Sequence, residues 1–225
     1  MSSGQFKALA VQFENVGGGS ISVKDVVSVD VPAGANAIAD TADQIWRWNT
    51  ASAAWDKYFY RVQRGTVYGW CKSGETAATT DEIPAGETFF YRRGTGATAT
   101  SMTLSGAVKE FSGSSQYTAS SGQLVFMANP WPVNVVIADF ANYQGSATGA
   151  NAIADTADQI WRWNTTSAAW DKYFYRVQRG TVYGWCKAGE TAATSDQIPA
   201  GEGFFFRRGT GSSLDTITLP APSAE

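Results

Sequence analysis

Histidine, which serves most often as a catalytic base and a metal ligand, is absent from the chain. Its absence excludes Ser-His-Asp and Cys-His catalytic groups and metal sites built on histidine. Carboxylates remain, and they can hydrolyse a glycosidic bond or hold calcium. None of the acidic residues has the spacing of such a motif, and turns, caps or cross-strand pairs explain them more simply. We therefore expect no enzyme activity, no cofactor and no bound metal ion.

The two cysteines, Cys71 and Cys186, occupy the same place in two related segments. One cysteine in each segment leaves too few thiolates for a zinc site. A disulfide between them would need their Cα atoms within roughly 7 Å of each other. Two buried, unpaired thiols are the simpler interpretation, and the sequence leaves both interpretations open.

Aromatic side chains beside arginine are the strongest chemical signal. The chain has 9 Trp, 9 Tyr and 12 Phe, and 22 of these 30 residues fall in the two related segments. Such rings pack in cores, line protein interfaces or stack against ligands, and arginine can stack on them. The candidates for an interface or a sugar-stacking site are Trp46, Trp48, Trp55, Trp70, Arg47 and Arg61, with their equivalents Trp161, Trp163, Trp170, Trp185, Arg162 and Arg176.

These signals come in duplicate because the chain contains an internal repeat. Residues 34–96 and 149–211 are two 63-residue blocks that align without a gap at an offset of 115 and differ at six positions. Packing alone tolerates wide substitution when volume and pattern are kept. Identity that extends to surface residues therefore indicates a recent duplication or a surface that both copies must present.

Strands must position these side chains. In the first block, aromatic and β-branched runs at 43–49, 55–63, 66–71 and 88–93 predict strands, and Gly65 marks a tight hairpin turn. No segment shows a sustained helical period. The predicted fold class is all-β, with two tandem, similar antiparallel domains, each sandwich-like or a partly open barrel.

Alternate residues of a strand face opposite sides of a sheet. Trp46 and Trp48 are therefore expected to share a face, with Arg47 on the other side. The same rule predicts that Tyr68 and Trp70 share a face. Aromatic rings are thus expected on both sides of at least one sheet, although a single core takes only one side.

The repeat predicts one domain at residues 1–104 and a second at 123–225, joined by a Ser/Gly-rich connector at 105–122 with room for short strands. Upstream of the identical blocks, residues 9–25 align loosely with 123–139 at an offset of 114. The connector sequence occurs once, so we expect the sheets to differ in their edges and at least one edge to stay open.

The net charge is −3, with 17 basic and 20 acidic residues. This balance provides no electrostatic footprint for nucleic acid or anionic lipid, and no apolar run is long enough to span a membrane. Ala, Gly, Ser and Thr fill many polar positions, a habit of secreted β proteins. We expect an extracellular or cell-surface protein. This sequence shows no signal peptide, and it leaves open whether Met1 is the native start or precedes a mature chain from which a signal peptide has been removed.

Short motifs run through the second repeat: Asn129-Pro130, Asp158-Gln159-Ile160, Trp163-Asn164, Ile198-Pro199-Ala200-Gly201-Glu202-Gly203 and Phe204-Phe205. This series resembles a tandem repeat of bacterial secreted and surface proteins and covers essentially all of the second repeat. The first repeat departs from it, with Asn15-Val16 at the opening and Thr88 in place of Gly. The resemblance implies an all-β extracellular module and supplies no catalytic residues.

These observations predict a non-enzymatic structural subunit of an extracellular assembly, such as a filament or a surface layer. Its partners would be copies of itself, which meet through repeat–repeat contacts and strand edges. The alternative is a carbohydrate-binding or adhesive module with two equivalent aromatic sites that recognise a surface polysaccharide.

Overall fold

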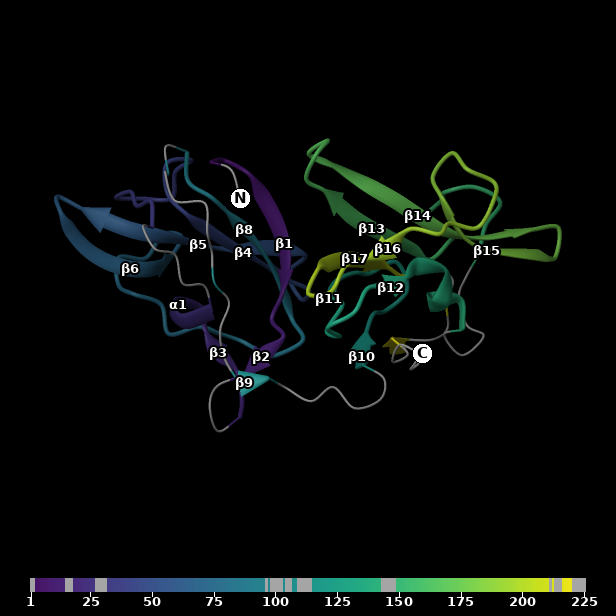
Figure 1. Ribbon diagram of the computed structural model, residues 1–225, viewed down its shortest axis with the longest axis horizontal. Coiled ribbons are helices and arrows are strands. Elements are labelled where there is room, and N and C mark those ends of the chain that lie inside the picture. Colours follow the sequence, from purple (N-terminus) through teal and green to yellow (C-terminus); the bar gives the residue numbers. More distant parts are fainter. Residues whose placement is uncertain are drawn as a thin grey trace. The chain divides into compact units, whose positions relative to one another are not determined.

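Each half of the chain is built around a five-stranded antiparallel sheet (Figure 1). The computed structural model describes residues 3–14, 18–26, 32–95, 97, 103, 107–108, 115–142, 149–210, 212 and 216–219. The chain divides into two compact units, residues 1–109 and 110–225. The all-β, sandwich-like fold that the strand patterns predict is confirmed.

In the first unit the large sheet has the order β1-β8-β4-β5-β6, and two small pairs, β3–β7 and β2–β9, accompany it. The elements are β1 (Phe6–Ala10), β2 (Phe13–Glu14), β3 (Ile21–Ser22), α1 (Val23–Val26), β4 (Gln44–Asn49), β5 (Ala54–Gln63), β6 (Thr66–Lys72), β7 (Glu82–Ile83), β8 (Thr88–Arg92) and β9 (Ala107–Val108).

The second unit has the equivalent sheet, β11-β17-β13-β14-β15, with the small pairs β12–β16 and β10–β18. Its elements are β10 (Ser115–Thr118), β11 (Leu124–Ala128), β12 (Val135–Val136), η1 (Ile137–Asn142), β13 (Gln159–Asn164), β14 (Ala169–Gln178), β15 (Thr181–Lys187), β16 (Gln197–Ile198), β17 (Gly203–Arg207) and β18 (Thr216–Leu219).

One face of each large sheet, here called the inner face, carries the main core. In the first unit Tyr58, Trp70 and Tyr91 are buried there against apolar residues of β3, α1 and β7. The second unit repeats this core around Tyr173, Trp185 and Phe206. The small pair and the short helix therefore form the second layer that makes each unit sandwich-like.

The structure corrects the alignment of the segments that precede the identical blocks. Phe6 of β1 lies opposite Arg92, and Leu124 of β11 lies opposite the equivalent Arg207, so these edge strands correspond at an offset of 118. Farther along, Ile21 of β3 lies opposite Ile83, and Val135 of β12 lies opposite the equivalent Ile198. The strands β3 and β12 therefore correspond at an offset of 114. The first repeat therefore has four extra residues in between, and β2 lies in this longer segment.

Asn129 consequently corresponds to Val11 and not, as the loose alignment predicted, to Asn15. The backbone N–H groups of Val11 and Asn129 donate to the equivalent carbonyls of Glu87 and Glu202, each at 2.9 Å. An ungapped comparison could not find this register, because the insertion shifts every residue before it.

The two units complete their cores with different strands. In the first unit Phe13, from β2, packs against the core cluster. In the second unit Tyr117, from β10, packs against the core, which also contains Ile217 of β18. The connector between the repeats contributes β9 to the first unit and β10 to the second.

A β-bulge corrects the predicted position of Tyr68. The β5–β6 register shifts between Arg61 and Val62, and Gly69 has a φ of 83°, a left-handed conformation that glycine adopts without strain. Trp70 lies in the core, whereas the Tyr68 ring lies under the Arg61 guanidinium and is exposed. The expectation that Tyr68 and Trp70 share a face is therefore wrong.

An entirely buried ion pair holds the end of β8 to the start of β4. In the first unit Arg93 pairs with Asp43, which also accepts backbone N–H bonds from Ala33 (2.9 Å) and Gly94 (2.7 Å). In the second unit Arg208 and Asp158 lie 3.1 Å apart and neither side chain is exposed. A Cβ at Gly94 would clash with the carbonyl oxygen of Thr41, so the chain passes this point only as glycine.

We expect Asp43→Asn to destabilise the first unit by about 3–5 kcal/mol, because it leaves the Arg93 charge buried without a counter-ion. The matched control is Asp40→Asn, since Asp40 pairs with Arg92 at 2.8 Å but its side chain is 82% exposed. That change should cost no more than about 1 kcal/mol. Urea unfolding followed by circular dichroism measures both, and equal losses would contradict the assigned role of the buried pair.

Candidate functional site

Three of the four candidate tryptophans of each repeat lie together on the outer face of the sheet. In the first unit Trp46, Trp48 and Trp55 form a connected ring cluster with Phe6 and Phe90, with ring centroids 5.0–6.1 Å apart. We call this cluster the aromatic face. The alternation rule is confirmed here, since these rings point away from the core that holds Tyr58 and Trp70.

The second unit repeats the aromatic face with Trp161, Trp163, Trp170 and Phe205. Phe126 joins it, stacked on Phe205 with centroids 4.4 Å apart. The tryptophans of the aromatic face are half-buried in both units. Each unit thus has rings on both sides of its sheet, which a single core does not require.

The tryptophan rings of the aromatic face meet one another edge to face or tilted and do not form a flat platform. Trp48 and Trp55 cross at 70°, and Trp46 and Trp55 at 56°. The ammonium group of Lys57 lies 3.9 Å from the centroid of the Trp46 ring, and the Trp46 indole N–H donates to Gln44 at 2.7 Å. Edge-to-face contacts and a cation over the ring fix the orientation of these side chains.

The remaining candidates lie elsewhere. Trp70 and Trp185 are buried in the cores on the inner faces. Arg47 shares that side with Phe89 and binds Glu87 through two nitrogens at 2.8 and 3.0 Å. These residues were candidates for the same site as the outer tryptophans, and the structure places them on the other side of the sheet, where alternation along the strand predicts Arg47.

Arg61 is buried and serves the fold of its own unit. Its guanidinium donates to the carbonyls of Asn36 and Thr76 and to the side chain of Gln63. It thereby ties two loops to β5, and one face of the guanidinium stacks on Tyr68 with 4.4 Å to the ring centroid. Arg176 stacks on Tyr183 in the same way.

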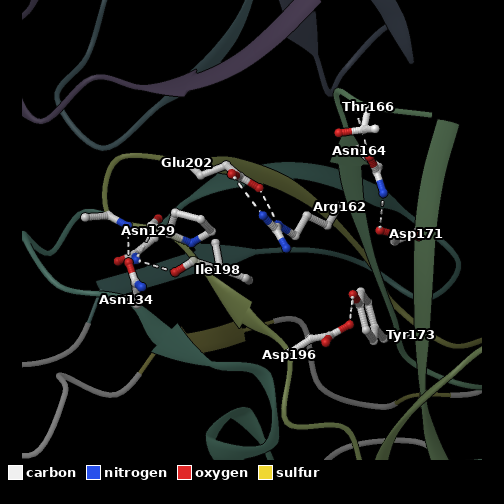
Figure 2. Close-up of polar contacts among 12 residues, drawn as sticks. Asn129, Asn134, Arg162, Asn164, Thr166, Asp171, Tyr173, Asp196, Ile198 and Glu202 are labelled. Atoms are coloured by element: carbon white, nitrogen blue, oxygen red, sulfur yellow. Dashed lines mark hydrogen bonds and ion pairs between the residues drawn. The ribbon is translucent and has the colours of Figure 1, made fainter. Parts of the chain in front are cut away.

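A cluster of polar side chains on the inner side of the second unit was not singled out from the sequence (Figure 2). Tyr173 donates to Asp196 at 2.6 Å, and Lys187 lies 3.5 Å from both Asp171 and Asp196. The Arg162–Glu202 pair lies nearby in the same view. These groups satisfy one another, so the cluster ties β14 and β15 to the segment just before β16 and offers little to a ligand.

The electrostatics of this cluster follow from those contacts. Burial, followed by the bond to Asp196, raises the pKa of the Tyr173 hydroxyl far above its ordinary value. The hydrogen bond from Tyr173 is the main cause that lowers the pKa of Asp196, with help from Lys187. The tyrosine stays a neutral donor and the aspartate an ionised acceptor, which is a charge-assisted hydrogen bond.

Asn129 is a second polar residue whose role appears only in the structure (Figure 2). Its buried amide donates to the carbonyls of Val133, Ile198 and Pro199 at 2.9–3.0 Å. Its side-chain oxygen accepts from the backbone N–H of Trp131 at 3.2 Å. This side chain therefore anchors the loop after β11, the place where the repeats diverge.

Within the described ranges, no group of three or more Cys, Asp or Glu side chains lies close enough together to hold a metal ion. The helices of that part of the chain are too short to cross a membrane. Comparison of the chain with protein-family models, curated proteins and solved structures yields no match. The resemblance to bacterial surface repeats accordingly stays a prediction.

Asn129→Val should destabilise the second unit by about 1–3 kcal/mol, because it leaves buried carbonyls without donors. The matched control is Val11→Ala at the equivalent position of the first unit, where the lost energy comes from packing alone. Hydrogen exchange of the Trp131 backbone amide, which donates to the Asn129 side chain, distinguishes the lost hydrogen bonds from lost packing. The amide should lose protection in the Asn129 variant and keep it in the Val11 variant. Unchanged protection of that amide in the Asn129 variant would contradict the anchoring role.

Tyr173→Phe should reduce stability at pH 7 by about 1 kcal/mol, since Asp196 is partly exposed and its hydrogen bond is screened. The folded-state pKa of Asp196 is lowered from 3.8, so its contribution is present above that value and is lost as the pH falls below it. The difference between wild type and variant should therefore shrink towards pH 2. Urea unfolding across this range measures it, with Tyr183→Phe as control, and a pH-independent difference would contradict the assignment.

Proposed function

We propose that this protein is a non-catalytic structural subunit that associates with copies of itself, outside the cell or on its surface. The observation that carries the proposal is the aromatic face, which is present in both units on the side of the sheet away from the main core. Trp, Tyr and Phe are enriched in protein interfaces, where rigid rings bury large areas at low entropic cost.

The sheet edges support the same proposal. β1 and β11 are edge strands of the large sheets. In the second unit the hydroxyl of Tyr117 bonds both the N–H and the carbonyl of Ala128, each at 3.4 Å, which covers the end of β11. The equivalent Ala10 of β1 shows no such hydrogen bond among the described residues, but it is only 1% exposed, and Ala8 and Leu9 are buried too. The start of β1, where Lys7 is exposed, is therefore the part of this edge that a strand of another chain can reach.

The carbohydrate-binding alternative receives less support from the geometry. A sugar-stacking site needs an open, flat ring with polar groups beside it. The tryptophan rings here meet edge to face or tilted, and Lys57 lies over Trp46. Arg47 and Arg61 are engaged within their own unit. We therefore keep self-association as the proposed function.

We expect the purified protein to form oligomers or filaments as its concentration rises, visible by electron microscopy and as a mass above 24.1 kDa in light scattering. Trp46→Ser with Trp161→Ser should weaken this association at least tenfold, because these half-buried rings contribute at the level of an interface hot spot. A 24.1 kDa monomer at all concentrations would refute the proposal.

The control for that experiment is Val133→Ser, which removes an exposed apolar side chain away from the aromatic face. Circular dichroism and thermal unfolding should show that each variant keeps the wild-type fold. Equal loss of association in the control would mean that general surface hydrophobicity, and not the aromatic face, drives the assembly.

A further inference from the structure

Most of the large apolar side chains that are exposed in the described part of the chain lie at two equivalent points. We call residues 61–69 and 176–184 the hairpin tips; each contains the end of β5 or β14, a two-residue turn and the start of β6 or β15. Of the six large apolar side chains exposed in the described part of the chain, four lie in the tips: Val67 (60%), Tyr68 (41%), Val182 (59%) and Tyr183 (41%). The two tips have identical sequences.

Each tip holds its tyrosine in a fixed orientation. Tyr68 lies against the guanidinium of Arg61, which is itself buried and hydrogen-bonded to two loop carbonyls. The turn is tight, with φ of 50° at Arg64 and 82° at Gly65. A ring that is already ordered in the free protein loses little entropy on binding, so this arrangement favours a contact surface.

The bulge at Gly69 indicates how such a contact is made. A bulge twists an edge strand and disrupts the ladder, which hinders the addition of another strand to β6. The contact therefore uses the side chains of Val67 and Tyr68 rather than backbone hydrogen bonds.

The charges at the tips indicate the partner. Each tip contains one exposed arginine, Arg64 or Arg179, and no acidic residue, because Arg61 and Arg176 are buried. The exposed arginines of the two tips carry +2, and because the whole chain carries −3, the remainder of it carries −5. Exposed carboxylates outside the tips include Asp25, Glu75, Glu82, Asp139 and Glu190. The tips of one chain thus complement the surface of another in charge.

We propose that the hairpin tips are docking points for a second copy of this chain, and that Val67, Tyr68 and Arg64, with their equivalents, contact an acidic surface of that copy. This inference rests on the proposed self-association and names a surface for it. A tip on one copy that meets a different surface on the next is a heterologous contact, which propagates unless it closes into a ring. Two tips on each chain also allow bivalent attachment.

The test compares wild type with two double variants, Tyr68→Ser with Tyr183→Ser and Arg64→Asn with Arg179→Asn. Asparagine tolerates the positive φ at the turn, so the second pair removes charge without backbone strain. We expect the tyrosine pair to weaken self-association at least tenfold at all salt concentrations, as measured by sedimentation and light scattering. The arginine pair should weaken it mainly at low salt, and high salt should weaken the wild type likewise.

The outcomes separate this inference from the proposed function. If wild type and both variants associate equally, the tips are not the contact, although self-association stands. If wild type stays a monomer throughout, the proposed function fails, and the inference fails with it. If wild type stays a monomer but binds the anionic polysaccharide alginate, and the tyrosine pair abolishes that binding, the tips recognise a sugar and the inference is overturned.

Discussion

The buried ion pair, Asp43 with Arg93 in the first unit and Asp158 with Arg208 in the second, is the constraint on which the rest of each unit depends. The Asp43 carboxylate forms an ion pair with Arg93 and accepts hydrogen bonds from two backbone N–H groups. The backbone N–H of Asp43 donates to the carbonyl of Ala33, and its carbonyl accepts from the N–H of Tyr60. A buried charge that loses one of these partners is expensive, so all the segments must meet at this point. The loop that precedes β4 is therefore drawn over the outer face, where Ala42 is buried with Phe59 and Cys71. This loop covers one part of the outer face, and the neighbouring part carries the aromatic cluster.

The sequence pattern is sufficient to predict the strands and the side to which most of their residues point. Trp46 and Trp48 share a face because the strand that carries them is regular, and alternation then decides their side. Tyr68 does not follow the alternation rule, because the bulge adds one residue to β6 and the Tyr68 ring then lies against Arg61. The signal was present as a glycine within a strand pattern, which often marks a bulge. The role of Asn129 could not be predicted from the sequence, because the first repeat has four extra residues after β1. An ungapped alignment of the two repeats therefore pairs Asn129 with the wrong residue.

The two units also show which parts of the fold admit alternatives. Both have the same sheet, but Asn129 of the second unit replaces Val11 of the first. Phe13 of β2 packs against the first core, whereas Tyr117 of β10 packs against the second. Cores accept different side chains when volume and pattern are kept. Packing therefore allows the ends of the repeats to diverge. Packing does not explain the near-identity of the central blocks, because it does not constrain the exposed residues of those blocks.

The six differences between the blocks bear on that point. Four of them lie at exposed positions: Ala51/Thr166, Ser73/Ala188, Thr80/Ser195 and Glu82/Gln197. The surface of the repeat has therefore changed where loops and a short strand reach solvent. None of the differences falls within the hairpin tips or among the tryptophans of the aromatic face. A recent duplication accounts for high identity everywhere, including at exposed Val67 and Tyr68. The proposed self-association adds a reason for these residues to stay unchanged as the repeats diverge further, because both halves of a subunit would then present the same contact surface.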